Sequence, residues 1–263
     1  MIPDNAIELP DNVIVAATQN LHKIKEIDAI TSGFGLRIVP RDEAGVPPVE
    51  IVEDGLSFEE NSYKKAFGIM ELCGRPTIAD DSGSEVDCLG GAPGIYSARF
   101  AAVEGIPEIY RSSCREGISV IGDEPGAGSQ PDAGNHTDAG NQPDAGNPIS
   151  DSDDKDNNCK LMKLLRDVPY EERTGRFVSV ITMVFPDDEP IVCRGTVEGH
   201  IITEERGEGG FGYDPMFIPD GYDKTFGQLP AELKNSISHR ANALKMLARK
   251  LQERQQTLTH KHR

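Results

Sequence analysis

The strongest constraint on the fold is an alternation of short apolar segments with segments of helical periodicity. The apolar run Val13 to Ala17 has the length of a buried strand, and isoleucines with helical spacing follow at 24–30. Residues 57–60, Ser-Phe-Glu-Glu, match a capping box and predict a helix that continues to about Cys73. The apolar residues 76–79 predict a second buried strand, which ends at an acidic pair.

The C-terminal half continues the alternation. A helix is predicted at 160–167, and the turn-forming residues between the β-rich segments 176–185 and 191–203 predict an antiparallel hairpin. Pro230 opens a last helix, whose leucines keep helical spacing as far as Leu251. Because strands and helices alternate throughout, we predict an α/β fold.

Low complexity marks the segment from Gly122 to Asn158, where hydrophobic residues almost vanish and a six-residue unit occurs three times in tandem at 130–147. Such a segment cannot bury enough apolar surface to offset its ordering entropy, which predicts a disordered acidic insertion. A calcium-binding repeat is the alternative, although one Asp per unit is sparse for calcium. We therefore predict a single catalytic domain at 13–251, interrupted by this insertion. An N-terminal extension at 1–12 and a polar tail at 252–263 that frays complete the chain.

Charge and composition argue against several classes of protein. A formal net charge of -17 disfavours binding to nucleic acid, because phosphate backbones are bound by clustered Lys and Arg. No apolar run approaches the roughly 18 residues of a membrane helix, so we expect no membrane association. The five cysteines form no C-x-x-C pair, which argues against a disulfide framework and a zinc site. The first ten residues do not resemble a secretory signal, and we expect a cytoplasmic protein.

The junction between the first predicted strand and helix is a candidate phosphate site. Thr18, Asn20 and Lys23 offer a hydroxyl, an amide and a cation there, next to helix N–H groups that have no intrahelical partner. Thr or Asn before a helix is also typical of a simple N-cap, and this alternative stays open.

The acidic pair Asp80 and Asp81, followed by Ser82, is a candidate metal site. Ligands of an α/β sheet bind at the carboxyl ends of its strands, and two adjacent acids repel each other unless a cation is present. Carboxylate oxygens suit Mg²⁺, and Glu53 is a further candidate ligand. The alternative is an Asp-Asp-Ser-Gly turn that caps itself.

Two further motifs suit recognition of a nucleobase. Four glycines within 207–215 predict a loop with unusual dihedral angles, and Phe211 offers a π-face for stacking. Lys234, His239 and Arg240 are donors that can read a carbonyl oxygen on a base edge. Core packing of Phe211 and an exposed helix face for the basic residues are the alternatives.

Four motifs in this order resemble those of the ITP/XTP pyrophosphatase family, also called Ham1-like or noncanonical purine NTP pyrophosphatases. They are Ala79-Asp-Asp-Ser-Gly83, Leu89-Gly-Gly-Ala-Pro-Gly-Ile-Tyr-Ser-Ala-Arg99, Gly209-Gly-Phe-Gly-Tyr-Asp-Pro215 and Ile237-Ser-His-Arg240. The resemblance covers roughly residues 13–102 and 158–251. It implies an elongated α/β fold, a mixed sheet with flanking helices in two lobes around a central nucleotide cleft, and usually a homodimer.

The resemblance also implies a reaction and a role for each matching residue. The reaction is Mg²⁺-dependent hydrolysis of ITP, dITP or XTP to the nucleoside monophosphate and pyrophosphate. The triphosphate would be held by Thr18, Asn20, Lys23 and Lys65. Glu53 and Asp81 would be the magnesium ligands, with Asp81 also orienting or deprotonating the attacking water and Ser82 touching the substrate. The base pocket would comprise Phe211, Gly212, Tyr213, Asp214, Lys234, His239 and Arg240.

Two features depart from the family pattern. Gln19 stands where the family usually has glycine, which would strain the phosphate loop if φ is positive there. The acidic insertion replaces a short connection between Arg99 and Lys160. These departures motivate a second hypothesis, a catalytically weak nucleotide-binding module with an acidic insertion that docks a partner.

Overall fold

A six-stranded mixed sheet with the order β2-β1-β3-β4-β5-β6 organises the computed structural model, which describes residues 10, 12–118 and 151–261. β1 pairs in parallel with β2 and β3, whereas β3, β4, β5 and β6 pair antiparallel. The strands are β1 (Val13–Ala16), β2 (Arg37–Pro40), β3 (Thr77–Val86), β4 (Thr174–Phe185), β5 (Asp188–Ile201) and β6 (Phe217–Pro219). The predicted antiparallel hairpin is β4 and β5, with a turn between Phe185 and Asp188.

Helices flank both faces of this sheet. The α-helices are α1 (Leu21–Thr31), α2 (Phe58–Cys73), α3 (Glu108–Arg111), α4 (Asp154–Leu165), α5 (Ala231–Ile237) and α6 (His239–Lys261). The 3-10 helices are η1 (Ser32–Phe34), η2 (Gly94–Ala102), η3 (Tyr170–Glu172) and η4 (Asp214–Met216). None of the described helices combines the length and the apolar character of a membrane span.

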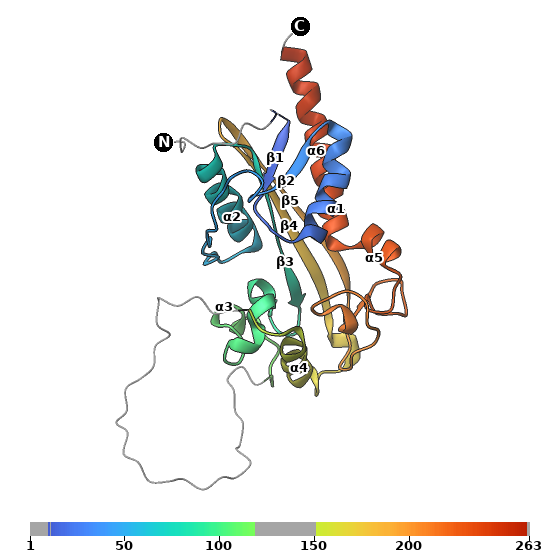
Figure 1. Ribbon diagram of the computed structural model, residues 1–263. Helices are drawn as coiled ribbons and strands as arrows, with labels where there is room; N and C mark the ends of the chain where they lie inside the picture. The colour runs from blue at the N-terminus through green and yellow to red at the C-terminus, as the bar shows by residue number, and fades with distance from the viewer. Residues whose placement is uncertain (1–9, 11, 119–150, 262–263) are drawn as a thin grey trace, which may run out of the picture.

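The molecule is elongated and has two lobes, as Figure 1 shows. In the upper lobe, α2 packs on β3 and β4, while α6 packs on β5 and β4 and α1 lies beside it. In the lower lobe, η2 packs on β3 and α4 packs on η2, at the far ends of the long strands. The predicted α/β fold, with a mixed sheet and flanking helices in two lobes, is confirmed.

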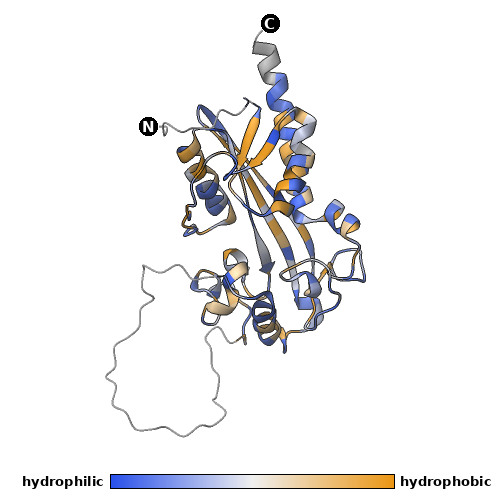
Figure 2. Cartoon of the chain, viewed as in Figure 1, coloured by the Kyte–Doolittle hydropathy of each residue, from blue (hydrophilic) through white to orange (hydrophobic). Residues whose placement is uncertain are grey.

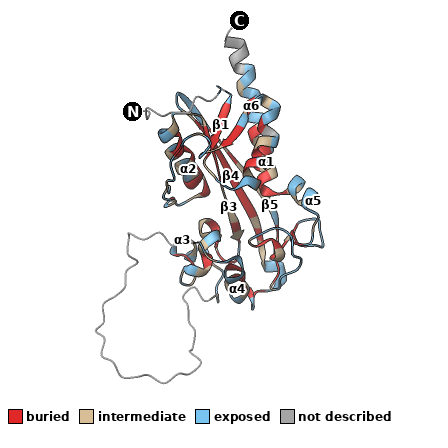
Figure 3. Ribbon diagram, in the orientation of Figure 1, coloured by how far each residue is buried: buried red, intermediate tan, exposed pale blue. Residues whose placement is uncertain are grey.

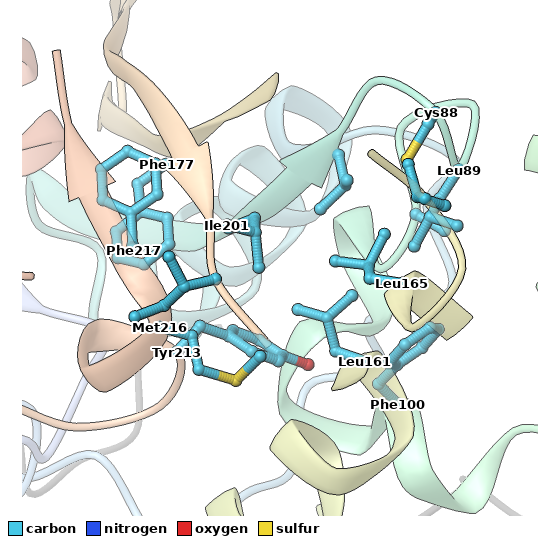
Figure 4. Close-up of a cluster of buried hydrophobic side chains, with 14 of the residues drawn as sticks. Cys88, Leu89, Phe100, Leu161, Leu165, Phe177, Ile201, Tyr213, Met216 and Phe217 are labelled. Carbon is cyan, nitrogen blue, oxygen red and sulfur yellow. The ribbon is translucent and has the colours of Figure 1, made fainter. Parts of the chain in front are cut away.

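Each lobe has its own hydrophobic core. In the upper lobe, Ile78 and Ile181 of the sheet pack against Ile27 of α1 and Leu247 of α6. In the lower lobe, aromatic and aliphatic side chains from β4, β5, α4 and the loops pack together, and Figure 4 shows them. The strands are accordingly the most hydrophobic and most buried segments, whereas the outer helix faces are polar and exposed (Figures 2 and 3). Hydrophobic burial therefore fixes the sheet between its helices.

The predicted capping box forms at the start of α2. The Ser57 hydroxyl accepts a hydrogen bond from the Glu60 amide at 3.1 Å. The Glu60 carboxylate reaches back and accepts from the Leu56 amide at 2.7 Å. Both bonds satisfy N–H groups near the helix start, and the helix ends at Cys73 as predicted.

Three helix boundaries differ from prediction. α4 begins at Asp154 rather than residue 160, because Asp153 caps it and Asn157 and Asn158 are buried against the lower lobe. The last helix is split at Ser238 into α5 and α6. α6 continues to Lys261, so residues 252–261 of the predicted polar tail are helical. Residues 1–9 and 11 of the predicted extension and 119–150 of the insertion lie outside the described residues.

The largest correction concerns the acidic pair. The prediction that the strand covers 76–79 and delivers the acidic pair at its end is wrong, because β3 runs from Thr77 to Val86 and pairs with β4 along its whole length. β1, by contrast, pairs with β3 only as far as Ile78. Beyond Ile78, β3 has no strand on its β1 side within the part of the chain that the structure describes. On this edge, the acidic pair thus lies between the end of the β1 pairing and the residues of β3 that bond to segment 92–97.

Gly195 of β5 should be essential for the close approach of α6. A Cβ there would lie 2.2 Å from the Ala243 nitrogen and 2.3 Å from the His239 carbonyl oxygen. Gly195→Ala should therefore lower the free energy of unfolding by about 1–3 kcal/mol, measured by urea titration. Gly33→Ala is the control, since a Cβ there meets no described atom within 4 Å. Equal stability of the two variants would contradict this packing.

Candidate active site

Asp80 and Asp81 face opposite sides of the sheet. Ile78 packs with the α1 and α6 side chains, and Ala79 packs with α2. Because successive residues of a strand point to opposite faces, Asp80 faces α1 and α6, and Asp81 faces α2. The two carboxylates therefore belong to two different sets of contacts.

Asp80 is the buried counter-charge of two cations. Its carboxylate lies 2.6 Å from the Lys23 ammonium and 3.2 Å from the Arg240 guanidinium, and it accepts a hydrogen bond from the Ser179 hydroxyl at 2.5 Å. The same guanidinium nitrogen lies 3.4 Å from the Ser82 hydroxyl. Burial alone would raise the pKa of Asp80, but Arg240 and Lys23 outweigh it and hold that pKa well below the ordinary value. Asp80 is thus ionised and joins α1, α6 and the sheet.

Asp81 belongs to a carboxylate pair that shares one cation. The Lys65 ammonium of α2 lies 2.9 Å from Asp81 and 3.0 Å from Glu53. Burial raises the pKa of Asp81 despite the nearby ammonium. Burial would lower the pKa of Lys65, but the two carboxylates raise it further than burial lowers it. One lysine therefore faces two acids, and the three side chains together carry a net negative charge.

The pair Glu53 and Asp81 fits a magnesium ion. Among the described residues no group of three or more His, Cys, Asp or Glu side chains could hold a metal. Mg²⁺, however, is usually bound through one or two carboxylates, with waters and substrate phosphates completing its shell. Two carboxylates that already converge on a single cation are a donor set of this kind.

A cleft of about 830 Å³ opens beside this carboxylate pair. Glu53 and Lys65 line it from the upper lobe, and Tyr96 and Arg99 line it from η2 in the lower lobe. Arg41 also lines it. The expected central cleft is therefore present between the lobes.

The residues predicted to hold phosphate form the start of α1. The Thr18 hydroxyl accepts from the Asn20 amide at 3.1 Å, and the Asn20 side-chain oxygen accepts from the Lys23 amide at 3.3 Å. These contacts are those of an N-cap. No described residue other than glycine has a positive φ, so the strain considered for Gln19 does not arise. The hypothesis of a weak nucleotide-binding module loses this support.

The glycine-rich loop at 207–215 presents Phe211 to solvent. Phe211 is 60% exposed, and the Lys234 ammonium lies 5.1 Å from the centre of its ring. Asp214 is buried, pairs with Lys234 and accepts from the Phe211 amide at 2.7 Å. Burial raises the pKa of Asp214, although Lys234 opposes this. A Cβ on Gly210, where φ is +79°, would lie 1.9 Å from the Asp214 carboxylate, so the loop requires glycine there. Because its ring is mostly exposed, Phe211 does not pack in the hydrophobic core, as the alternative had it.

The next residues of the loop anchor it to the lower lobe. Tyr213 is buried, and its hydroxyl donates to the Ser97 carbonyl at 2.9 Å. The Gly212 amide donates to the Asp154 carboxylate at 2.7 Å. The loop is therefore fixed to both η2 and α4.

His239 is a buried, uncharged side chain beside the Asp80 contacts. Its ring lies edge-on to Phe177, 5.4 Å between ring centres. Burial, and then the adjacent Arg240, lower the pKa of His239 to about 3. Its Nδ1 is buried without a hydrogen-bond partner among the described residues. A neutral imidazole with a free ring nitrogen can donate to, or accept from, a ligand.

The chain resembles known proteins in both sequence and fold. The sequence matches the profile of the Ham1 family over residues 14–114 and 144–250. The chain belongs to the Ham1 family. A dITP/XTP pyrophosphatase of Desulforamulus reducens is 39% identical over 233 residues, which cover 88% of this chain and 92% of that protein. One of Xylella fastidiosa is 38% identical over 236 residues, which cover 89% and 94%. A solved Ham1 protein from Staphylococcus aureus matches with a TM-score of 0.68 at 33% identity, covering 92% of this chain and 99% of that one.

This Ham1 chain brings its predicted site residues together in three groups. Lys23 and Arg240 meet at Asp80, with Ser82 beside Arg240. Glu53 and Asp81 meet at Lys65 beside the cleft, and Phe211 and Asp214 meet at Lys234. Sequence reasoning placed Asp80 beside Asp81 in a candidate metal site, whereas the structure pairs Asp80 with Lys23 and Arg240. It assigned no role to Arg99. Continuing the strand pattern past residue 79 would have separated Asp80 from Asp81. The roles predicted for the individual residues stay predictions.

Asp80→Asn should destabilise the Ham1 chain strongly. Lys23 and Arg240 would lose their buried counter-charge, which should cost about 3–5 kcal/mol near neutral pH. Because the folded pKa of Asp80 lies below the ordinary value of 3.8, its stabilisation is present above 3.8 and lost as the pH falls below it. Urea unfolding at neutral and acidic pH should therefore show a difference from the unsubstituted chain that narrows in acid.

Asp54→Asn is the matched control for this prediction. Asp54 pairs with Lys64 at 2.6 Å, but its side chain is 70% exposed. Exposed pairs contribute little because solvent screens them, so this variant should unfold like the unsubstituted chain. Equal effects of Asp80→Asn and Asp54→Asn at neutral pH would contradict the role given to Asp80.

Proposed function

We propose that this Ham1-family chain hydrolyses noncanonical purine nucleoside triphosphates, namely ITP, dITP and XTP, to the monophosphate and pyrophosphate. The observation that carries the proposal is the arrangement around β3. A carboxylate pair suited to Mg²⁺ lies on one face, and basic groups near an exposed aromatic ring lie towards the other. The proteins of Desulforamulus reducens and Xylella fastidiosa, named dITP/XTP pyrophosphatases, support the same reaction.

We propose that the nucleotide crosses the edge of β3 just beyond the end of the β1 pairing and so reaches groups on both faces. β1 stops at Ala16, opposite Ile78, so a ligand beyond that point can contact groups from either side of the strand. We place the triphosphate at the cleft lined by Glu53 and Lys65, and the base towards Phe211. This placement of the nucleotide agrees with the rule that ligands of α/β sheets bind where parallel strands end.

Glu53 and Asp81 are the residues we propose to hold Mg²⁺. When bound, Mg²⁺ neutralises charge on phosphate oxygens and lowers the pKa of bound water. Asp81 orients the attacking water and accepts its proton, which the raised pKa of this carboxyl favours. Water oxygen bonds to the α-phosphorus, the α–β anhydride bond breaks, and pyrophosphate leaves. Lys65 donates hydrogen bonds to the phosphates.

Selection of the base follows from donors at one end of the site. Lys234, Arg240 and neutral His239 offer N–H groups that can pair with a 6-oxo group. Adenine carries a 6-amino donor there, which would leave these groups unpaired, so we propose that ATP is rejected. Phe211 stacks on the base.

We extend the proposal to a homodimer in the cytoplasm, which rests on the family resemblance. Sedimentation of the purified chain should give twice the monomer mass of 28.6 kDa. Sedimentation at the monomer mass would contradict the dimer and leave the reaction untouched.

Asp81→Asn should abolish turnover without unfolding the protein. Loss of a proposed metal ligand that also handles the attacking water should reduce pyrophosphate release from ITP by at least about 100-fold. Glu172→Gln, a change at a partly exposed acid outside the cleft lining, should keep full activity. Pyrophosphate release with added Mg²⁺ measures both, and retained activity in Asp81→Asn would contradict the mechanism.

Phe211→Ala should lower the catalytic efficiency with ITP but should not lower the thermal stability of the protein. Loss of one stacking ring should lower kcat/KM for ITP by about 5- to 100-fold, as for other base–aromatic contacts. The melting temperature should hold, because the ring is 60% exposed. Tyr222→Ala, another partly exposed aromatic, is the control. An unchanged kcat/KM in Phe211→Ala would contradict the proposal that the base stacks on Phe211.

A further inference from the structure

The motif from Leu89 to Arg99 has no role in the mechanism above, and it ends in the cleft. We propose that Arg99 binds the terminal phosphates of the nucleotide and stabilises the departing pyrophosphate. This inference rests on the proposed function and adds one binding residue, supplied by the lobe opposite Lys65.

Contacts on two sides hold the Arg99 side chain at the cleft. Its guanidinium lies 5.3 Å from the centre of the Tyr96 ring. One of its nitrogens lies 3.4 Å from the backbone carbonyl oxygen of Glu53, across the cleft. Glu53 and Lys65 line the same cleft. Arg99 therefore reaches, from the other lobe, the backbone of a residue that we propose binds the metal.

The backbone around Arg99 is shaped to bring η2 close to β3. A Cβ on Gly83 would lie 2.4 Å from the Ser97 hydroxyl and 2.7 Å from the Gly94 carbonyl, so η2 packs directly on β3 two residues after Asp81. Arg99 itself interrupts η2, with φ -126° and ψ 22° instead of helical values. Irregular backbone is concentrated at functional sites, and here it coincides with the residue that enters the cleft.

Charge gives the clearest reason for a further cation. A nucleoside triphosphate is a polyanion, yet Glu53, Lys65 and Asp81 together carry more negative than positive charge. Of the other predicted site cations, Lys23 and Arg240 share Asp80, and Lys234 pairs with Asp214. Within the described chain, Arg99 forms no ion pair with a carboxylate, so its positive charge is available to phosphate. A guanidinium also suits phosphate because it donates two parallel hydrogen bonds.

Binding of inorganic pyrophosphate, measured by calorimetry in the presence of Mg²⁺, tests the proposal. Arg99→Gln keeps much of the side-chain length and a donor for the Glu53 carbonyl, but removes the charge. It should weaken pyrophosphate binding by about tenfold to a hundredfold, which is the loss of affinity expected when a hydrogen bond to a charged group is removed. Arg99→Lys should weaken binding less, because it restores the charge without the paired donors. Arg115→Ala, which breaks an exposed pair with Glu172 outside the cleft, should bind like the unsubstituted chain.

Substrate discrimination provides the second measurement. Because Arg99 is assigned to phosphate and not to the base, Arg99→Gln should lower kcat/KM for ITP and ATP by the same factor. Unchanged pyrophosphate binding in folded Arg99→Gln would overturn the inference, as would a change confined to the ITP-to-ATP ratio. If the unsubstituted chain binds pyrophosphate through Arg99 yet releases none from ITP, the proposed reaction fails, and only the assignment of Arg99 to phosphate binding holds.

Discussion

Pairing of β3 with β4 on one edge, and with β1 only up to Ile78 on the other, is the constraint on which the site depends. The pairing keeps β3 extended through Asp80 and Asp81, and an extended strand sends adjacent side chains to opposite faces. Two neighbouring acids therefore avoid competing for one position. Asp80 becomes a buried structural charge, whereas Asp81 lies on the other face with Glu53 and Lys65, where we propose that Mg²⁺ binds.

Burial of Asp80 is costly and is offset by the cations around it. Arg240 lies at the start of α6, where the helix dipole disfavours a positive charge, and the Asp80 carboxylate compensates for this. Ser238 caps α6 by accepting from the Ala241 amide at 3.2 Å, which explains why the last helix is split there. Gly195 lets the same turn approach β5. The site is thus built from the elements that hold the upper lobe together.

Much of this arrangement could be predicted from the sequence, and the failures have identifiable causes. Apolar periodicity and the capping box predicted the sheet, the hairpin and α2 because those signals are local. The end of β3 was misplaced, since Asp80 to Gly83 reads as a turn when its partner strand, almost a hundred residues later, is ignored. Arg99 was missed for a related reason: only the tertiary packing of η2 on β3 brings it to the cleft. Long-range contacts decide both positions.

The different roles of Asp80 and Asp81 can be tested directly with Mn²⁺ as a spectroscopic substitute for Mg²⁺. Paramagnetic resonance would count bound Mn²⁺ in the presence of pyrophosphate for folded Asp81→Asn and Asp80→Asn protein. The account predicts that Asp81→Asn loses the bound ion and that Asp80→Asn keeps it, because only Asp81 shares a cation with Glu53. Loss of the ion in Asp80→Asn, with binding retained in Asp81→Asn, would contradict it.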